Sequence, residues 1–417
     1  MRSTVDAILS GVNAALLVVL VGGLWVGAGC SGGVEGRSQA DEAPTLWFDG
    51  SAGDLPSCPA ETASPVVDTN GNGVDDMAYG QTYAGQWNDL EHWGFWRRLL
   101  AGEVAGREAW SNHADAWQLD LSERYPVRVL DPGGQPVVGA TVELVDGTEE
   151  VLWEGRTDAA GRAELYANLD GEAPAESPTV IASKQGAEVR GAAGSPGDRR
   201  ETLELPITRP DSKLVDVVFL LDNTSSMDEQ SPGLQVDIDG AIEQLAERFG
   251  QEYTFSYNYQ GFRDGQGGTF HPFSPEPAKL GPLADPTGGG DYPEGITAAM
   301  DRATRALNWH DDAEMKIMVL ITDAPNRSDG ATIDKIPHLI EEMSTMGIRV
   351  VTVAGTGIDE RGEYLLRALS MTTGGRFIYT MRSEPYLPSR EPAVGRLDVD
   401  CLDGVFYEAM SELLASE

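Results

Sequence analysis

The strongest constraint on the fold of this chain is a strand–helix alternation over residues 213–417. The run DVVFLLD (216–222) is almost continuously apolar, which is typical of a strand buried on both faces of a parallel sheet. KIMVLITDA (316–324) is a second such run, and segments with helical periodicity lie between these and other short apolar runs. This alternation predicts an α/β fold with a doubly wound, mostly parallel sheet, which binds ligands at the carboxyl ends of its strands.

Oxygen-bearing side chains follow both apolar runs where each predicted strand ends. The loop DNTSSMD follows the first strand, the second strand ends in Thr-Asp, and the stretch TGGGDYPEG lies just before a helix. Carboxylates and hydroxyls are hard oxygen donors, which suit Mg²⁺ or Ca²⁺ better than Zn²⁺. The predicted ligands of this divalent cation are Asp222, Thr224, Ser226, Asp291 and Asp323.

The same loop allows a purely structural interpretation. Asp, Thr and Ser are ordinary helix-capping residues, so DNTSS also fits the N-terminal cap of the first helix of the α/β region. The aspartates on the other two segments favour the cation, because a cap does not require them.

The α/β region resembles the von Willebrand factor type A (vWA) family and its metal-ion-dependent adhesion site. The resemblance rests on DNTSSM, which fits the motif Asp-x-Ser/Thr-x-Ser, together with LITDAP in the expected order. It implies that Asp222, Thr224 and Ser226 lie at the metal and that Asp323 assists, often through a water. It also implies a protein ligand that is bound through an acidic side chain.

The third element of the motif departs from the family. The family usually has a Thr in this glycine-rich loop, whereas this sequence resembles a GGGDxPE subtype that would place Asp291 there. The substitution adds a negative charge to the site. That charge weakens the case for binding a partner's carboxylate.

A second candidate cation site is the segment DTNGNGVDD (68–76). Its oxygen side chains and Gly73 fit positions 1, 3, 5, 6 and 9 of a calcium loop, but Tyr79 stands where position 12 needs a carboxylate. The segment therefore resembles the short calcium loops of thrombospondin-type and dockerin-like repeats. The same residues are also common turn formers, so a plain turn is the alternative. The candidate calcium ligands are Asp68, Asn70, Asn72 and Asp76.

The N-terminal residues predict export. Residues 1–29 combine Arg2 with an apolar run from Ala14 to Val26, which is short for a membrane-spanning helix. The following VGAGC resembles a bacterial lipobox and implies lipidation of Cys30, although the family usually has a larger aliphatic residue than Gly27. Ordinary signal cleavage that leaves a free thiol is the alternative. Acyl chains on Cys30 would anchor the protein to a cell-envelope membrane.

Two further cysteines, Cys58 and Cys401, lie in the exported part of the chain. An oxidising compartment would allow them to form a disulfide, which would join the start of the folded region to its end. Sequence does not establish the distance between them, so two unpaired thiols are the alternative.

Three segments precede the α/β domain, which we expect over 213–417. Residues 30–60 are rich in Gly, Ser, Asp and Pro and predict a flexible linker. Residues 61–119 contain a tryptophan-rich helical pattern beginning near Gln86, which we expect to dock its aromatic stripe on a neighbouring domain. Residues 120–208 show short alternating strands between Gly, Pro and Asp turns, which predict an antiparallel β-sandwich. VRVLDPGGQPVVGATVELVD and TDAAGRAEL there resemble carboxypeptidase-regulatory-like and bacterial immunoglobulin-like spacer modules.

The charge balance excludes one class of partner. Asp and Glu number 67 against 30 Lys and Arg, which gives a formal charge of −37. Nucleic acid binding needs a basic face, so we expect no nucleic-acid partner. The sequence also has no Walker A, HExxH or GxSxG pattern, and its five histidines are scattered. We therefore do not expect an enzyme.

These observations predict a lipid-anchored protein of the bacterial cell envelope that presents a metal-dependent, protein-binding vWA domain on a stalk. Two alternatives remain open from the sequence. One is an envelope hydrolase that uses the cation as a Lewis acid, and the other is a protein in which the metal only stabilises the fold.

Overall fold

The computed structural model describes most of the chain beyond residue 81. The chain divides into two compact units, residues 1–39 and 40–417, and every described residue belongs to the second. No helix in the described part of the chain has the length and hydropathy needed to cross a bilayer. The described residues are 82–167, 169, 178–207, 213–227, 231–263, 266–267, 272–275, 293–355, 357–382, 392–395 and 399–415. The signal peptide, the linker, Cys30, Cys58, Asp291 and the loop residues Asp68, Asn70, Asn72 and Asp76 lie outside them.

One large sheet dominates the described structure, with strand order β11-β10-β9-β12-β13-β14-β1-β15. The pairs from β10 to β14 are parallel, whereas β11, β1 and β15 pair antiparallel with their neighbours. The predicted α/β fold with a mostly parallel sheet is therefore confirmed. The strands are β1 (Thr82–Trp87), β9 (Leu214–Asp222), β10 (Thr254–Arg263), β11 (Gln266–Gly267), β12 (Met315–Thr322), β13 (Ile348–Ala354), β14 (Phe377–Arg382) and β15 (Asp400–Cys401).

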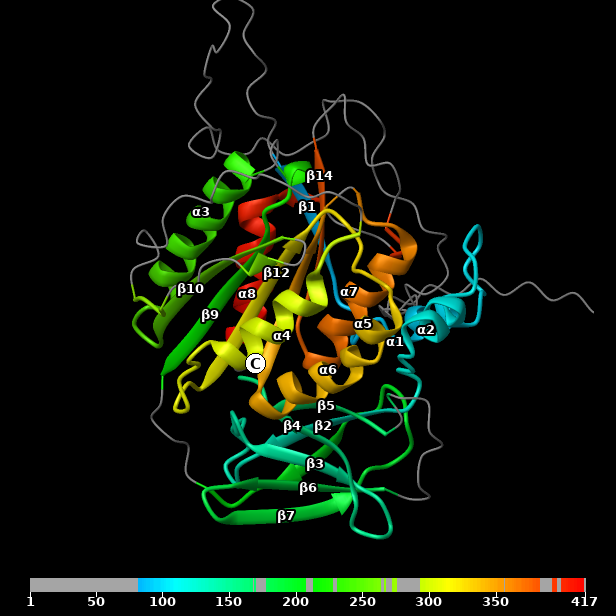
Figure 1. The fold of residues 1–417 in the computed structure, drawn as a ribbon. Coiled ribbons are helices and arrows are strands. Elements are labelled where there is room, and N and C mark those ends of the chain that lie inside the picture. The colour runs from blue at the N-terminus through cyan, green and yellow to red at the C-terminus, as the bar shows by residue number, and fades with distance from the viewer. Residues whose placement is uncertain are drawn as a thin grey trace, which may run out of the picture. The chain divides into compact units, whose positions relative to one another are not determined.

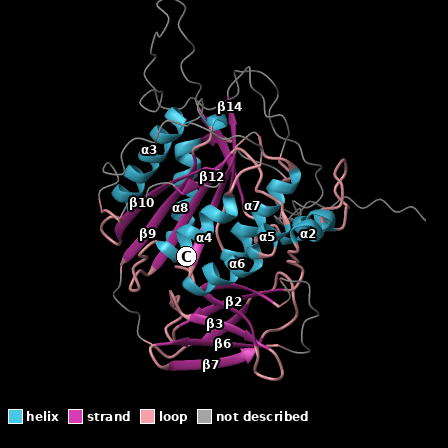
Figure 2. Ribbon diagram, in the orientation of Figure 1, coloured by secondary structure: helices cyan, strands magenta, loops and turns pink. Residues whose placement is uncertain are grey.

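Helices cover both faces of this sheet (Figure 1; Figure 2). Alternate residues of the central strands point to opposite faces, as the strand period requires. Phe219 of β9 and Val319 of β12 pack with α3 and α8, whereas Val218 and Met318 share a cluster with α4, α6 and α7. The helices are α3 (Ser231–Phe249), α4 (Ile296–Ala306), α5 (Gly330–Ile333), α6 (Lys335–Met346), α7 (Glu360–Thr373) and α8 (Leu402–Leu414).

Strand β1 corrects the predicted domain boundaries. We expected residues 61–119 to form a separate segment and the α/β domain to begin at 213. Instead β1 pairs antiparallel with β14, from Thr82↔Arg382 to Trp87↔Phe377, and so belongs to the large sheet. Its sequence TYAGQW contains Gly and only one β-branched residue, so it gives a weak strand signal. The edge of β14 supplies the backbone partners that make it a strand.

The tryptophan-rich segment forms two short helices, α1 (Trp93–Leu100) and α2 (Ser111–Trp117). The first begins at Trp93, later than we predicted, because β1 occupies the residues before it. Trp96 stacks on Tyr364 of α7 with ring centroids 5.3 Å apart, and the Trp117 indole donates to the Arg361 carbonyl at 2.8 Å. The structure thus buries these tryptophans against α7, as the docking interpretation predicted.

A buried charge network fixes the segment after β1 to α7. The guanidinium of Arg367 is fully buried and donates to Asp89 Oδ2 at 2.8 Å and to Glu363 Oε1 at 3.0 Å. It also lies 4.8 Å from the centroid of the Trp110 ring. Removing one partner from such a network would leave uncompensated charge in the core.

Residues 120–208 form two small sheets, but not a purely antiparallel sandwich. A three-stranded sheet has the order β5-β2-β8 and a four-stranded sheet the order β4-β3-β6-β7. Strand β8 pairs parallel with β2, which corrects the antiparallel expectation. Between β5 and β8 the chain forms β6 and β7 of the four-stranded sheet. Strand β8 then lies beside β2 and runs in the same direction. The strands are β2 (Arg124–Leu130), β3 (Thr141–Val145), β4 (Val151–Arg156), β5 (Arg162–Tyr166), β6 (Thr179–Lys184), β7 (Ala187–Ala192) and β8 (Glu201–Glu204).

Three turns of this all-β segment are stabilised in the same way by an aspartate side chain. The Asp158 carboxylate accepts from the N–H groups two and four residues on, Ala160 at 2.9 Å and Arg162 at 2.7 Å. Asp131 and Asp146 make the same pair of bonds in their own turns. Asp in this position stabilises a turn without any ligand. Part of the acidity of the chain therefore has a local structural role.

Pro337 lies where two short helices meet. The apolar spacing of ATIDKIPHLIEEMSTMG predicts one helix, which Pro337 should kink. Pro337 instead lies in the first turn of α6, and α5 ends at Ile333. A proline lacks the N–H that would bond the carbonyl four residues back, and its ring clashes with that carbonyl, which here belongs to Ile333.

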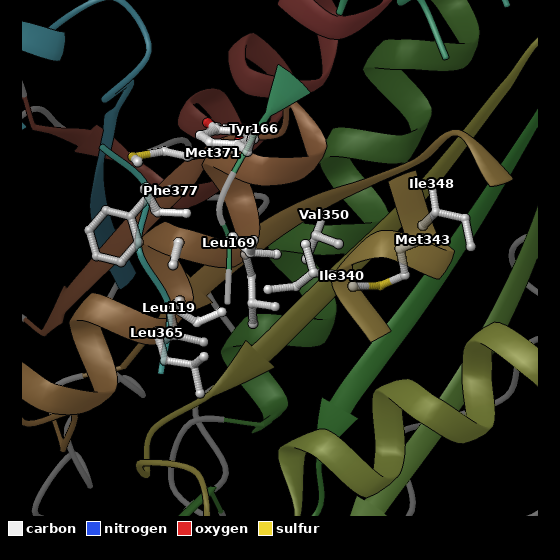
Figure 3. Close-up of a cluster of buried hydrophobic side chains, with 14 of the residues drawn as sticks. Leu119, Tyr166, Leu169, Ile340, Met343, Ile348, Val350, Leu365, Met371 and Phe377 are labelled. Atoms are coloured by element: carbon white, nitrogen blue, oxygen red, sulfur yellow. Dashed lines mark hydrogen bonds between the residues drawn. The ribbon is translucent and has the colours of Figure 1, made fainter. Parts of the chain in front are cut away.

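Apolar side chains of the all-β segment and of the α/β region form one core. Figure 3 shows Tyr166 and Leu169 in a cluster with Ile340 of α6 and Leu365 of α7. The contact between the two regions is therefore hydrophobic and close-packed.

Candidate functional site

The candidate site lies at the carboxyl ends of β9 and β12, which are adjacent parallel strands. Their register pairs Leu221 with Ile321, so Asp222 and Thr322 follow side by side. Asp323 follows directly after the last residue of β12. This edge of the sheet is where the α/β fold was expected to bind a ligand.

The structure brings four of the five predicted metal-site residues into one hydrogen-bonded network. Thr224 Oγ1 donates to Asp222 Oδ1 at 2.7 Å and lies 3.0 Å from Ser226 Oγ. Ser226 Oγ lies 2.9 Å from Asp323 Oδ1, to which it donates. Side chains from the loops after two strands, separated by about a hundred residues, thus come into direct contact. Asp291 lies outside the described residues.

Asp222 is the most deeply held member of this network. It has no exposed surface, and its Oδ1 also accepts from the Thr224 backbone N–H at 3.0 Å. Its Oδ2 accepts from Thr322 Oγ1 at 2.9 Å. A buried carboxylate needs such donors or a cation to offset its desolvation.

Thr322 is a site residue that the sequence analysis missed. Its hydroxyl holds the second oxygen of Asp222 and orients the carboxylate towards Thr224. The Thr-Asp pair at the end of the second apolar run was the available signal. We assigned a role only to its aspartate.

The hydroxyl groups of Thr224 and Ser226 are the remaining candidate ligands of the site. When each hydroxyl donates to its own carboxylate, no hydrogen lies between Thr224 Oγ1 and Ser226 Oγ, which are 3.0 Å apart. Both hydroxyl oxygens then keep lone pairs for a ligand, and each lies within hydrogen-bond distance of an aspartate oxygen. Such a set of hard oxygen atoms suits Mg²⁺ or Ca²⁺.

Access to this network is from the side of Ser226. Ser226 is exposed, whereas Thr224 and Asp323 are buried. A small hollow lined by Met227, Thr322 and other residues lies beside it at the ends of β12, β13 and β14. A ligand would therefore reach the network past Ser226.

Two glycines make room for the loops around the network. A Cβ atom at Gly357 would lie 2.1 Å from the Asp323 carbonyl oxygen. One at Gly261 of β10 would lie 2.4 Å from Asn223 Nδ2. The first distance requires the backbone at Asp323 to move, whereas the second requires only a shift of the Asn223 side chain beside Asp222.

The segment that follows Asp291 also returns to the site. The Glu294 N–H donates to the Pro325 carbonyl at 2.9 Å, and Asn326 Nδ2 donates to Thr297 Oγ1 at 2.7 Å. These bonds join the start of α4 to the loop after Asp323. Among the described residues, no group of three or more His, Cys, Asp or Glu side chains is arranged to hold a metal. The network itself offers two carboxylates and two hydroxyls.

Cys401 of β15 is disulfide-bonded. The other two cysteines of the sequence, Cys30 and Cys58, lie outside the described residues. Pairing of Cys401 with Cys58 therefore stays a prediction.

No family model matches the sequence, and no curated protein matches it. Among solved structures, the SpRpn10 VWA domain is similar with a TM-score of 0.32 and 10% identity, covering 43% of this chain and 90% of that domain. Proximal thread matrix protein 1 from the mussel byssus is similar with a TM-score of 0.29 and 16% identity, covering 38% of this chain and 40% of that one.

Proposed function

We propose that this protein is a binding protein that holds one divalent cation, Mg²⁺ or Ca²⁺, at the carboxyl ends of β9 and β12. The cation would in turn bind an acidic side chain of a protein partner. The observation that carries this proposal is the network of Asp222, Thr224, Ser226 and Asp323, in which oxygen atoms from two strands converge and one member is exposed.

Each residue has a distinct role in this proposal. Asp222 supplies charge from a fixed position, because Thr322 and the Thr224 backbone hold both of its oxygens. Ser226 supplies a hydroxyl ligand at the accessible side. A bound cation would compensate the buried negative charge of the aspartates and leave a coordination position for the partner.

The charge of the site limits what it binds. Asp222 and Asp323 together balance one divalent cation, which leaves a neutral centre able to accept a partner's carboxylate. If Asp291 joins as predicted, the centre carries one net negative charge and its affinity for that carboxylate falls. A partner that offers a neutral oxygen would then compete better.

Export and lipidation at Cys30 belong to the same proposal. The acyl chains would hold the protein at a membrane of the bacterial cell envelope, with residues 30–60 as the spacer. The metal-binding end of the α/β region would then be presented to other envelope proteins.

A structural role for the cation is the second candidate, and the full burial of Asp222 favours it. The test is capture of envelope proteins on immobilised protein, with and without chelator, using wild type and Ser226→Ala. Thr148→Ala is the matched control, because this exposed hydroxyl bonds only its local Asp146 turn. Partners that are lost with chelator and with Ser226→Ala support binding through the metal. Partners that persist in both cases support the structural role.

A further inference from the structure

A second charged site lies at the amino end of β13, whereas the metal network lies at the carboxyl end of the neighbouring parallel strand β12. It is formed where the all-β segment meets the start of β13 and the turn between α7 and β14. A small hollow of about 40 Å³ is lined there by four arginines. This arginine hollow is defined by Arg162, Arg200, Arg349 and Arg376, and Glu91, Asp158 and Glu164 also line it.

Arg349 is the unusual member of the arginine hollow. Its side chain is 6% exposed, and it donates through Nη1 to the Thr373 carbonyl at 2.7 Å and through Nη2 to the Arg156 carbonyl. No carboxylate in the described structure forms an ion pair with it. A buried guanidinium that is bonded only to carbonyls has no carboxylate in direct contact to neutralise its charge.

The other arginines of the hollow already have acidic partners. Arg162 Nε lies 2.9 Å from Asp158 Oδ2, and Arg376 Nε lies 2.7 Å from Glu412 Oε2. Arg200 lies 2.7 Å from Glu164. These carboxylates are therefore not available to neutralise Arg349.

Glu164 pairs with a second arginine as well, so the arginines in and around the hollow outnumber the carboxylates that line it. Arg124 also lies 2.7 Å from Glu164, on the side away from solvent. Burial opposes ionisation of Glu164, but Arg124 and Arg200 outweigh it and lower its pKa to about 2. One carboxylate thus serves two guanidinium groups.

The charges around Arg349 act in both directions. Burial is the main cause that lowers the pKa of Arg349, attraction by Asp158 and Glu164 opposes it, and like-charge repulsion from Arg162 and Arg376 is a smaller contribution. Asp158 and Glu164 attract it, but each is already bonded to another arginine. In a chain with 67 acidic and 30 basic residues, a hollow in which guanidinium groups exceed their acidic partners is a local reversal of charge.

We propose that the arginine hollow binds a small oxyanion of the phosphate type. A guanidinium group presents a planar set of N–H donors that matches tetrahedral and carboxylate oxygens. Arg349 would contribute the donors that its two carbonyl partners leave unused, and Arg162 would contribute from the accessible side. The anion would neutralise the buried charge at the junction between the all-β segment and the α/β region.

The anion would also stabilise this junction. Arg349 lies on β13, whereas its acceptor Arg156 ends β4 of the all-β segment. Arg156 in turn donates through Nε to the Thr345 carbonyl of α6 at 3.0 Å. Binding at Arg349 therefore acts on the residues that connect the two regions.

The experiment is calorimetric titration of inorganic phosphate into the full-length protein in non-ionic detergent. Divalent cations are removed on a chelating resin, and ionic strength is held constant with chloride. Sulfate, acetate and the headgroup analogue glycerol phosphate form parallel arms, which separate a free anion from a lipid headgroup. We expect saturable binding of one phosphate per chain, with acetate much weaker.

Three variants test the assignment. Arg349→Met and Arg162→Gln should each raise the Kd for phosphate at least tenfold, whereas Glu91→Gln should lower it, because Glu91 is an exposed acid at the rim. Arg305→Gln on α4 is the control and should leave the Kd unchanged, since Arg305 pairs with Asp301 and Glu342 outside the hollow. If Arg349→Met fails to fold, Arg162→Gln and Glu91→Gln still decide the question. The proposal is wrong if wild type shows no saturable binding or if the Kd is the same in Arg162→Gln and Glu91→Gln.

Discussion

A buried pair of acids between α3 and α8 makes the stability of this protein depend on pH in an unusual direction. Asp237 of α3 and Asp403 of α8 are both buried. Burial, and after it the negative charge of Asp403, raises the pKa of Asp237 to about 7. Replacing this acid with a neutral amide of the same shape should stabilise the fold at neutral pH.

The sign and the size follow from linkage. The pKa of Asp237 is higher in the folded protein than its usual 3.8, so the folded state binds the proton more tightly than the unfolded state. Stability from this group is present below pH 4 and is lost as the pH rises towards 7. A difference of about three units corresponds to about 4 kcal/mol at most, since one unit is about 1.4 kcal/mol.

The assay is urea unfolding of wild type and Asp237→Asn at several pH values between about 4 and 8. The free-energy difference between the two proteins should grow with pH in favour of Asp237→Asn. Glu247→Gln is the control, because Glu247 lies exposed on the same helix. If Asp237→Asn is equally stable relative to wild type at pH 5 and pH 8, or less stable at pH 8, the reasoning about this pair is refuted.

Three further predictions concern the core, the site loops and the disulfide. Arg367→Met should lower the free energy of unfolding by about 3–5 kcal/mol, because two buried carboxylates lose their counter-ion. Arg305→Met should change the free energy of unfolding little when both variants are measured by chemical denaturation. Equal losses in Arg367→Met and Arg305→Met would contradict the role of the buried network. Gly357→Ala should weaken cation binding in calorimetry by displacing Asp323, and unchanged affinity would show that the loop adapts. Cys401→Ser should lower the free energy of unfolding by about 2–5 kcal/mol relative to oxidised wild type. Relative to wild type whose disulfide has been reduced, the variant should be equally stable.

The sequence was sufficient to predict the fold of the α/β region, because the central strands of this region are buried on both faces. Runs such as DVVFLLD carry enough apolar residues to identify a central strand without knowledge of its neighbours. Once parallel strands are recognised, residues at their carboxyl ends must meet at one edge. That is why Asp222 and Asp323 could be paired across about a hundred residues of sequence.

Other features depend on contacts that periodicity does not encode. The pairing of β1 with β14 joins distant segments, and the TYAGQW pattern does not name its partner. The same holds for the parallel pairing of β8 with β2. Thr322 was missed because a threonine in a strand has an ordinary structural use, and its bond to Asp222 depends on strand register. The arginine hollow could not be predicted from the sequence for the same reason, since its arginines come from separate turns and strands.

The measurement that tests the central proposal most directly is calorimetric titration of Mg²⁺ and Ca²⁺ into metal-stripped protein. The variants are Ser226→Ala and Asp323→Asn, with Thr148→Ala as the control, and Asp76→Asn distinguishes the predicted calcium loop. Wild type, Thr148→Ala and Asp76→Asn should keep a cation site that Ser226→Ala and Asp323→Asn weaken at least tenfold. Cation binding that is absent from wild type, or that is unchanged in Ser226→Ala and Asp323→Asn, would contradict the proposed metal centre.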